Sequence, residues 1–233
     1  MALIYAPLFL YLALLLFYIY TMQYFMELDI HLNIIDDPEL RFLKTYNLCY
    51  FTIWNFIFQI IFILLVLLDE SLKIFCNRKN FSTVLGKVRA LFFHSAILPS
   101  SVMVACFFWI LWNINEDLMM PRSVSKIFPL WLNHVLHSSV IIAVVIELIL
   151  PKRDNFVEFK STVPIVLIIF FSYNIVLYSI YFLEGVWLYP IYRILSWPLK
   201  ISFSLLQFVA GLSLTKVGIN VQNLKRPKLL KFE

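Results

Sequence analysis

The chain has 233 residues, of which 62% are hydrophobic and 14% are charged, and its formal net charge is +5. Average globular proteins contain about 25% charged residues, so this composition excludes an ordinary soluble domain. Apolar stretches recur along the whole chain, and each is long enough to cross a hydrocarbon core about 30 Å thick. The sequence therefore predicts an all-α integral membrane protein.

Six apolar stretches are expected to form one bundle of six transmembrane helices, a single membrane domain covering residues 1–233. In chain order they lie at about 5–22, 48–68, 91–112, 129–150, 163–183 and 198–214. The first has no basic segment before it and no small-residue cleavage site after it, so we interpret it as a retained helix and not as a signal peptide. Residues 217–233 are predicted to form a basic cytoplasmic tail.

Lysine and arginine residues are distributed unevenly between the two sides of the predicted bundle. The side of the two termini has the larger share, in the segments 73–89, 152–160 and 216–231. Cytoplasmic loops carry the excess of these cations in membrane proteins, so we expect both termini in the cytoplasm. Anionic head groups at that surface account for the net charge without a nucleic acid partner.

The first loop on the opposite side, residues 23–47, is acidic. Such a segment is usually a solvated linker, and the alternative is a cover over an outward-facing cavity. The three cysteines, Cys49, Cys76 and Cys106, form neither a disulfide framework nor a zinc pattern.

A polar stripe marks the start of the second span. Thr52, Asn55 and Gln59 fall within roughly 60° of one another on a helical wheel. Such residues often hydrogen-bond neighbouring membrane helices, and the other interpretation is a functional site.

The fourth span begins with a second polar group, which includes His134, His137 and Ser138. Titratable groups in membrane helices usually face a protein interior or a cavity. The second and fourth spans run in the same direction, and Thr52 and His134 both lie roughly 6–8 Å below the outer boundary at 1.5 Å per residue. We therefore expect these two side chains to meet, so that the histidine removes the hydroxyl proton and activates a nucleophile.

The remaining polar and aromatic groups allow more than one role. His94 and Glu147 are expected to pair with cations at the cytoplasmic boundary. Several outward groups are candidates to orient His134, with no spacing that selects among them: Glu184, Glu116, Asp117 and His31. Three aromatic residues at the outer boundary are either interfacial anchors or the mouth of a cavity: Trp131, Trp187 and Tyr189.

Three motifs resemble the androgen-induced protein family over nearly the whole chain. They are Trp-Leu-Asn-His-x-x-His-Ser at 131–138, Phe-Thr at 51–52 and Gly-x-Trp-x-Tyr-Pro at 185–190. The Asn-His motif is fairly specific, whereas the threonine segment alone is weak. The resemblance implies a multipass threonine hydrolase that cleaves fatty acid esters of hydroxy fatty acids, with Thr52 as nucleophile and His134 as base.

We therefore predict a membrane-embedded lipid esterase whose partners are its lipid ester substrate and membrane lipids. This mechanism needs no metal ion and no organic cofactor. The candidate oxyanion donors or substrate contacts are Asn55, Gln59, Asn133, His137, Ser138 and Trp187. The site is expected to face the lumenal or extracellular side of the endoplasmic reticulum or the plasma membrane.

Two alternatives from other classes stay open. One is a metal-dependent enzyme in which His134 and His137, three residues apart, supply the first ligands. The other is a non-catalytic lipid-binding or regulatory membrane protein.

Overall fold

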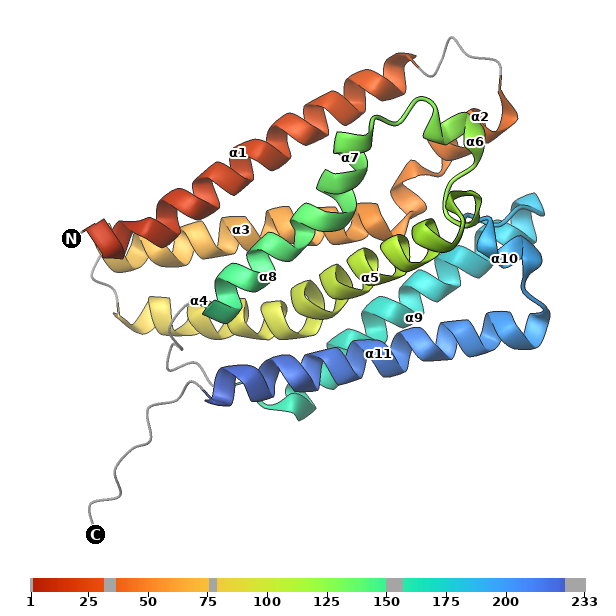
Figure 1. The fold of residues 1–233 in the computed structure, drawn as a ribbon. Helices are drawn as coiled ribbons and strands as arrows, with labels where there is room; N and C mark the ends of the chain where they lie inside the picture. Colours follow the sequence, from red (N-terminus) through yellow and green to blue (C-terminus); the bar gives the residue numbers. More distant parts are fainter. Residues whose placement is uncertain (1, 32–36, 76–78, 150–156, 225–233) are drawn as a thin grey trace.

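A computed structural model describes residues 2–31, 37–75, 79–149 and 157–224, and within these ranges the chain forms helices and no strands (Figure 1). The α-helices are α1 (Ala2–His31), α2 (Pro38–Thr45), α3 (Phe51–Phe75), α4 (Lys79–Phe92), α5 (Leu98–Ile114), α6 (Arg122–Ser125), α7 (Leu130–His134), α8 (Val140–Ile149), α9 (Phe159–Glu184), α10 (Ile191–Ile194) and α11 (Trp197–Leu224). Two short 3₁₀ turns, η2 (Asn47–Cys49) and η4 (Glu116–Leu118), and two π-turns, η3 (Phe93–Ile97) and η5 (Val135–Ser139), connect or interrupt them.

The prediction of an all-α protein with six membrane helices is confirmed. Within the described residues, six helical segments are long and apolar enough to cross a membrane: Pro7–Leu28, Phe51–Ile74, Val84–Ile114, Leu130–Ile149, Phe159–Glu184 and Trp197–Leu224. The last helix is longer than expected, because α11 continues through residues 217–224 of the predicted tail. Residues 225–233 lie outside the described part of the chain.

The third membrane helix also starts earlier than expected, and this corrects the interpretation of Arg89 as a loop cation. Arg89 lies in α4 and is 2% exposed. Its guanidinium contacts Glu70 at 2.8 Å and Asp69 at 3.3 Å on α3, and it also pairs with Glu147 on α8. A buried charge needs such partners. Because these carboxylates pair with the guanidinium, the membrane helix can include Arg89 instead of starting after it.

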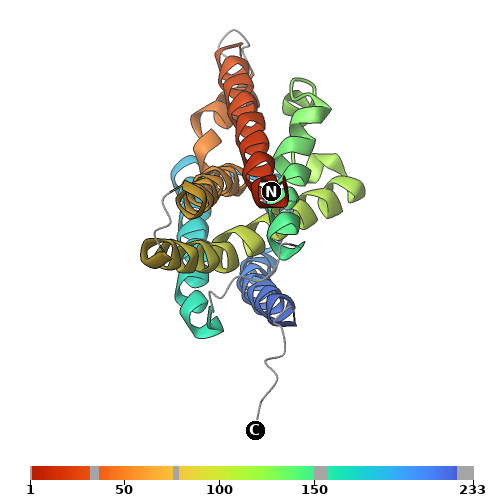
Figure 2. The same cartoon turned by 90° about the vertical axis from the view of Figure 1, so that its left-hand side faces the viewer.

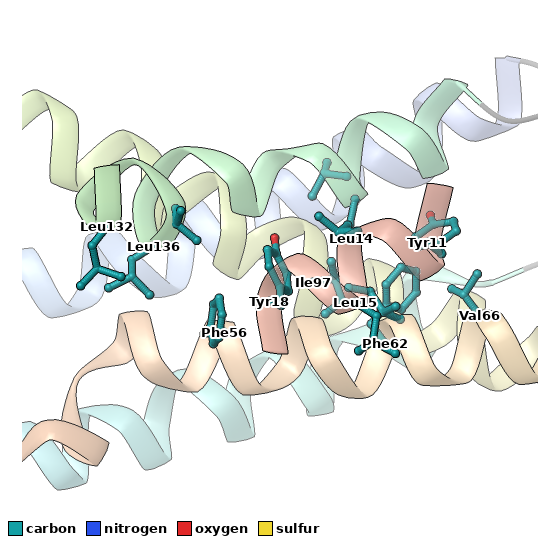
Figure 3. Packing of buried hydrophobic residues seen from close by; sticks show 14 of the residues in the cluster. Tyr11, Leu14, Leu15, Tyr18, Phe56, Phe62, Val66, Ile97, Leu132 and Leu136 are labelled. Atoms are coloured by element: carbon teal, nitrogen blue, oxygen red, sulfur yellow. The ribbon is translucent and has the colours of Figure 1, made fainter. Parts of the chain in front are cut away.

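The largest apolar cluster forms where α1 crosses α3 and α8 (Figure 3). Tyr18 of α1 packs against Phe56 of α3, with ring centroids 4.8 Å apart. Toward its end α1 departs from α3, and α7 also leans away from it, as both views show (Figures 1 and 2). The helices diverge at the end of the bundle that carries α2, α6 and α10, here called the site end (Figure 1).

The acidic segment 23–47 is largely helical in its described parts, because α1 continues to His31 and α2 begins at Pro38. The Asp37 carboxylate caps α2 by accepting hydrogen bonds from the amides of Glu39 and Leu40 at 2.8 and 3.2 Å. Leu40 is buried, which fastens α2 over the site end of the bundle.

Candidate active site

The hydroxyl of Thr52 lies 3.3 Å from Nε2 of His137. Thr52 is the second residue of α3, so it stands at the positive end of a 25-residue helix. His137 lies in the π-turn η5. π-Turns widen a helix locally and are frequent at functional sites. A threonine and a histidine from two different membrane helices therefore form a hydrogen-bonded pair.

The hydrogen bond on the other side of the imidazole determines which nitrogen carries the proton. His137 Nδ1 lies 2.9 Å from the carbonyl oxygen of Asn133, which can only accept, so Nδ1–H is the donor. In the neutral ring, Nε2 then presents its lone pair to the Thr52 hydroxyl. The ring also stacks on Phe108, with centroids 3.5 Å apart and planes 8° apart. His137 is thus held in the tautomer and orientation of a general base.

His134, which the sequence paired with Thr52, lies elsewhere. Its side chain is exposed, stacks on Trp109 with centroids 4.8 Å apart, and has Nδ1 3.3 Å from the Ser138 hydroxyl. The expectation assumed that spans two and four are parallel and begin at one depth. Instead α7 leans away from α3 (Figure 1), and η5, one turn later, is the segment that packs against α3. The structure therefore brings His137 to Thr52, and not His134.

Asn55 and Gln59 serve packing between helices in this structure. The Asn55 side-chain oxygen accepts hydrogen bonds from Ser100 at 2.8 Å and Ser101 at 3.0 Å on α5. The Gln59 amide donates to Ser101 at 2.7 Å and to the carbonyl of Val140 at 2.8 Å. Both side chains are fully buried and neither lines a cavity described below.

The other candidates separate into two groups. Asn133 contributes its backbone carbonyl to His137, while Ser138 accepts a hydrogen bond from the Trp109 indole at 2.9 Å. Trp187 is 4% exposed and lines the main cavity. Within the described ranges, His134 and His137 have no third histidine, cysteine or carboxylate close enough to complete a possible metal site.

A cavity of about 310 Å³ opens beside the Thr52–His137 pair. This volume lies at the lower end of the range of small-molecule sites. Its walls are mostly apolar and come from α2, from the segment 119–128 and from the segment 186–193. Two charged residues, Glu39 and Arg193, stand at its edge with Oε1 and Nη1 3.9 Å apart. The alternative role of the acidic segment, covering a cavity, therefore matches α2.

Two further cavities adjoin the main one. A small apolar cavity of about 70 Å³ shares four lining residues with it: Thr52, Phe108, Met119 and Tyr189. A third, of about 380 Å³, lies between α1 and α3 and shares Phe25, Asn47, Ile53 and Leu136 with the main cavity. Thr52 thus lines both the main cavity and the small one, here called the two chambers. The main chamber also shares wall residues with the third cavity, which lies beside α1.

Sequence reasoning missed three contributors to this site. Phe108 stacks on the base, Arg193 supplies a cation at the edge, and Tyr189 is bonded to the start of α3 through the Phe51 amide at 3.2 Å. From sequence, Tyr189 was an aromatic residue of the outer boundary, either an interfacial anchor or part of a cavity mouth. Its place two residues after Trp187, in a motif that carries the family resemblance, was the available signal.

Near the site end, the outward acidic groups have partners of their own. The Tyr46 hydroxyl donates to Glu184, and this bond raises the pKa of Tyr46. Asp117 pairs with Arg122 at 3.0 Å. The group that orients the base is therefore the Asn133 carbonyl and not one of these carboxylates.

Comparison with known proteins gives one family over almost the whole chain. The family model described as FAR-17a/AIG1-like protein matches residues 6–223. The androgen-dependent TFPI-regulating protein of Mesocricetus auratus is 28% identical over 177 residues, which are 76% of this chain and 75% of that protein. Its Mus musculus counterpart is 32% identical over 152 residues, 65% of each chain. The androgen-induced gene 1 protein of Homo sapiens is 27% identical over 95 residues, 40% of this chain and 38% of that protein. No solved structure matches the chain.

Proposed function

The chain belongs to the FAR-17a/AIG1-like protein family, and from this membership and the Thr52–His137 contact we propose that it is a membrane-embedded carboxylic ester hydrolase. Its substrates are lipid esters, with fatty acid esters of hydroxy fatty acids as the class that the family resemblance favours. The single observation that carries the proposal is the 3.3 Å separation between the Thr52 hydroxyl and the unprotonated nitrogen of a buried imidazole.

In the first half of the reaction, His137 Nε2 takes the Thr52 proton while Oγ1 attacks the ester carbonyl carbon. The tetrahedral intermediate collapses, the carbon–oxygen bond to the alcohol breaks, and the imidazolium returns its proton to the leaving alkoxide. The hydroxy fatty acid departs and the acyl group stays on Thr52. Threonine is a weak nucleophile without such a base. The helix terminus under Thr52 further stabilises the negative charge that develops there.

In the second half, water replaces the alcohol. His137 removes a proton from the water, the hydroxide attacks the acyl carbon, and the proton passes to Thr52 as the fatty acid leaves. The main cavity reaches the charged edge at Glu39 and Arg193, which offers water a route to the pair. The same arrangement suits a site on the lumenal or extracellular side, which we propose together with cytoplasmic termini.

The cavities fit a substrate with an ester in the middle of two chains. The apolar walls on both sides of Thr52 hold hydrocarbon, and the space between α1 and α3 gives an ester in the bilayer a lateral approach. Arg193 at the edge can bind the free carboxylate of a hydroxy fatty acid ester. The same apolar cavity also suits a lipid-binding protein without turnover, which is the second candidate function.

The test is hydrolysis of a fatty acid ester of a hydroxy fatty acid by the purified full chain in lipid nanodiscs. A fluorophosphonate probe on wild type should label Thr52, and Thr52→Ala should lose labelling and turnover while remaining folded. Thr52→Ser should retain activity, because a hydroxyl stays beside His137. Ester binding with no turnover by wild type, or unchanged turnover by Thr52→Ala, would overturn the proposal; the first result would favour the lipid-binding function.

A further inference from the structure

Tyr189 is the one tyrosine whose side chain lines both chambers that meet at Thr52, within the part of the chain that the structure describes. The preceding helix α9 ends at Gly185, whose φ of +69° is in the left-handed region that glycine adopts without strain. This turn directs the segment 186–190 back over the bundle. Tyr189 thereby comes to the start of α3, where Thr52 lies.

The phenol oxygen of Tyr189 receives two hydrogen bonds. The backbone amide of Phe51 donates to it at 3.2 Å, and the hydroxyl of Tyr173 donates at 2.9 Å. Its own O–H has no acceptor among the described residues. The ring is fixed by an edge contact with Tyr50, at 5.5 Å between centroids. The Tyr189 hydroxyl is thus held in place by the two hydrogen bonds that it accepts. Its own proton remains available for a hydrogen bond to a third group.

We propose that the Tyr189 hydroxyl is an oxyanion donor, a catalytic residue that binds the ester carbonyl oxygen when Thr52 attacks. This inference rests on the proposed ester hydrolysis and names a further residue of that same site. The negative oxygen that forms on the carbonyl carbon accepts the Tyr189 proton in a hydrogen bond, without proton transfer. The two donors behind the phenol oxygen polarise its O–H bond and strengthen this donation.

The protonation state of Tyr189 agrees with this role. Burial raises the pKa of Tyr189, although the hydrogen bonds from Tyr173 and Phe51 act in the opposite direction. The phenol therefore stays protonated at neutral pH and remains a donor through the reaction. Preorganised donors aimed at developing charge are usually the largest single contribution to such catalysis.

The oxyanion donors expected from sequence are less suited. The Gln59 amide already donates to Ser101 and Val140, and the Asn55 side chain points to the serines of α5. Neither lines the chambers at Thr52. Tyr189 does, together with Thr52 and His137 in the main chamber.

The experiment separates anion binding from nucleophile positioning, because Tyr189 also contacts the start of α3. A long-chain alkyl phosphonate, a stable tetrahedral anion, is titrated into full-length Thr52→Ala and Thr52→Ala/Tyr189→Phe proteins in nanodiscs. Neither protein has a nucleophile at position 52, so a change in the placement of the Thr52 hydroxyl cannot affect phosphonate binding. We expect at least tenfold weaker phosphonate binding by the double variant. Binding of a neutral ketone of the same chain length should be unchanged.

Turnover gives the second measurement. In the otherwise wild-type protein, Tyr189→Phe should lower kcat on the order of 10²–10³-fold, the usual loss for one oxyanion donor, with KM little changed. Tyr178→Phe is the matched control, because it removes a hydroxyl 3.2 Å from Ser204 at the α9–α11 interface and away from both chambers. It should keep wild-type kcat.

If Tyr189→Phe does not fold, Tyr173→Phe decides the question, because it keeps the Tyr189 hydroxyl but removes one donor behind it. It should weaken phosphonate binding severalfold in the Thr52→Ala protein; unchanged binding would overturn the inference. Equal phosphonate affinity with and without the Tyr189 hydroxyl would also overturn it. In both cases, ester turnover that depends on Thr52 leaves the proposed function standing, whereas its absence in wild type refutes the proposed function itself.

Discussion

The same two membrane helices carry polar groups at both ends of the bundle, and the two ends use them differently. At the site end, Thr52 of α3 meets His137, which leads into α8, beside a cavity of about 310 Å³. At the opposite end, Asp69 of α3 and Glu147 of α8 surround Arg89, and the Tyr11 hydroxyl donates to Glu147 at 2.7 Å. The first set borders a cavity, whereas the residues of the second set line none of the cavities described above.

This difference indicates that the polar groups at one end stabilise the bundle, whereas those at the other end are the ones we propose to be catalytic. Buried polar groups are costly unless they are satisfied. Around Arg89, the ion pairs join α3, α4 and α8, so the network holds helices together. At Thr52, the hydrogen-bond donors and acceptors also border a cavity, where a substrate can supply further hydrogen-bond partners. If the two ends are separable, a substitution at one end should leave the property of the other end unchanged.

The largest expected effect distinguishes the two histidines at the site end. His137→Ala should reduce kcat for ester hydrolysis on the order of 10²–10⁴-fold, the usual contribution of a general base. His134→Ala should change it by less than about threefold, as an exposed side chain away from Thr52 does. Steady-state turnover of both variants, with melting curves as folding controls, measures the comparison. A loss at His134 equal to that at His137 would restore the assignment made from sequence.

The next effect concerns the opposite end and is one of stability. Arg89→Met leaves Glu147 without its cation, while Asp69 and Glu70 keep Lys73, and breaking a buried pair costs roughly 3–5 kcal/mol. Unfolding in mixed micelles with increasing denaturing detergent measures this loss. Turnover per folded molecule should stay near wild type, because the site lies at the other end of the helices.

The matched control is Arg122→Met, since Arg122 also pairs with a carboxylate but its side chain is 78% exposed. Exposed pairs contribute about 1 kcal/mol or less, so this variant should unfold close to wild type. Equal stability losses in the two variants would show that burial does not distinguish the network around Arg89. A large loss of turnover in folded Arg89→Met would show that the two ends are coupled.

The smallest expected effect is on substrate selection at the edge of the cavity. Arg193→Gln should raise KM about fivefold for an ester with a free carboxylate, equivalent to about 1 kcal/mol for a half-exposed charge pair. KM for the methyl ester of the same lipid should not change. Arg122→Gln, another exposed arginine that lines none of the described cavities, is the control. A rise in KM for both lipids would assign Arg193 a packing role.

The class of the protein and the number of its membrane helices follow from the amino-acid pattern alone. Apolar stretches of spanning length are visible without knowledge of their neighbours, because each membrane helix satisfies its own backbone hydrogen bonds. The pattern also indicated the region of the site, since polar residues inside such helices are rare and stand out. Thr52 and the segment from Asn133 to Ser138 were found in this way.

Which of these polar groups meet depends on how the helices pack. His137, and not His134, meets Thr52 because α7 leans away from α3 and the π-turn η5 follows it. A helical wheel represents neither feature. Asn55 and Gln59 were indistinguishable from Thr52 by periodicity, yet their partners lie on α5. Tyr189 and Arg89 were assigned to a boundary and a loop for the same reason. The position of a residue along its own helix can be read from the sequence. Its lateral contacts depend on how the neighbouring helices tilt and how the connecting segments fold back over the bundle.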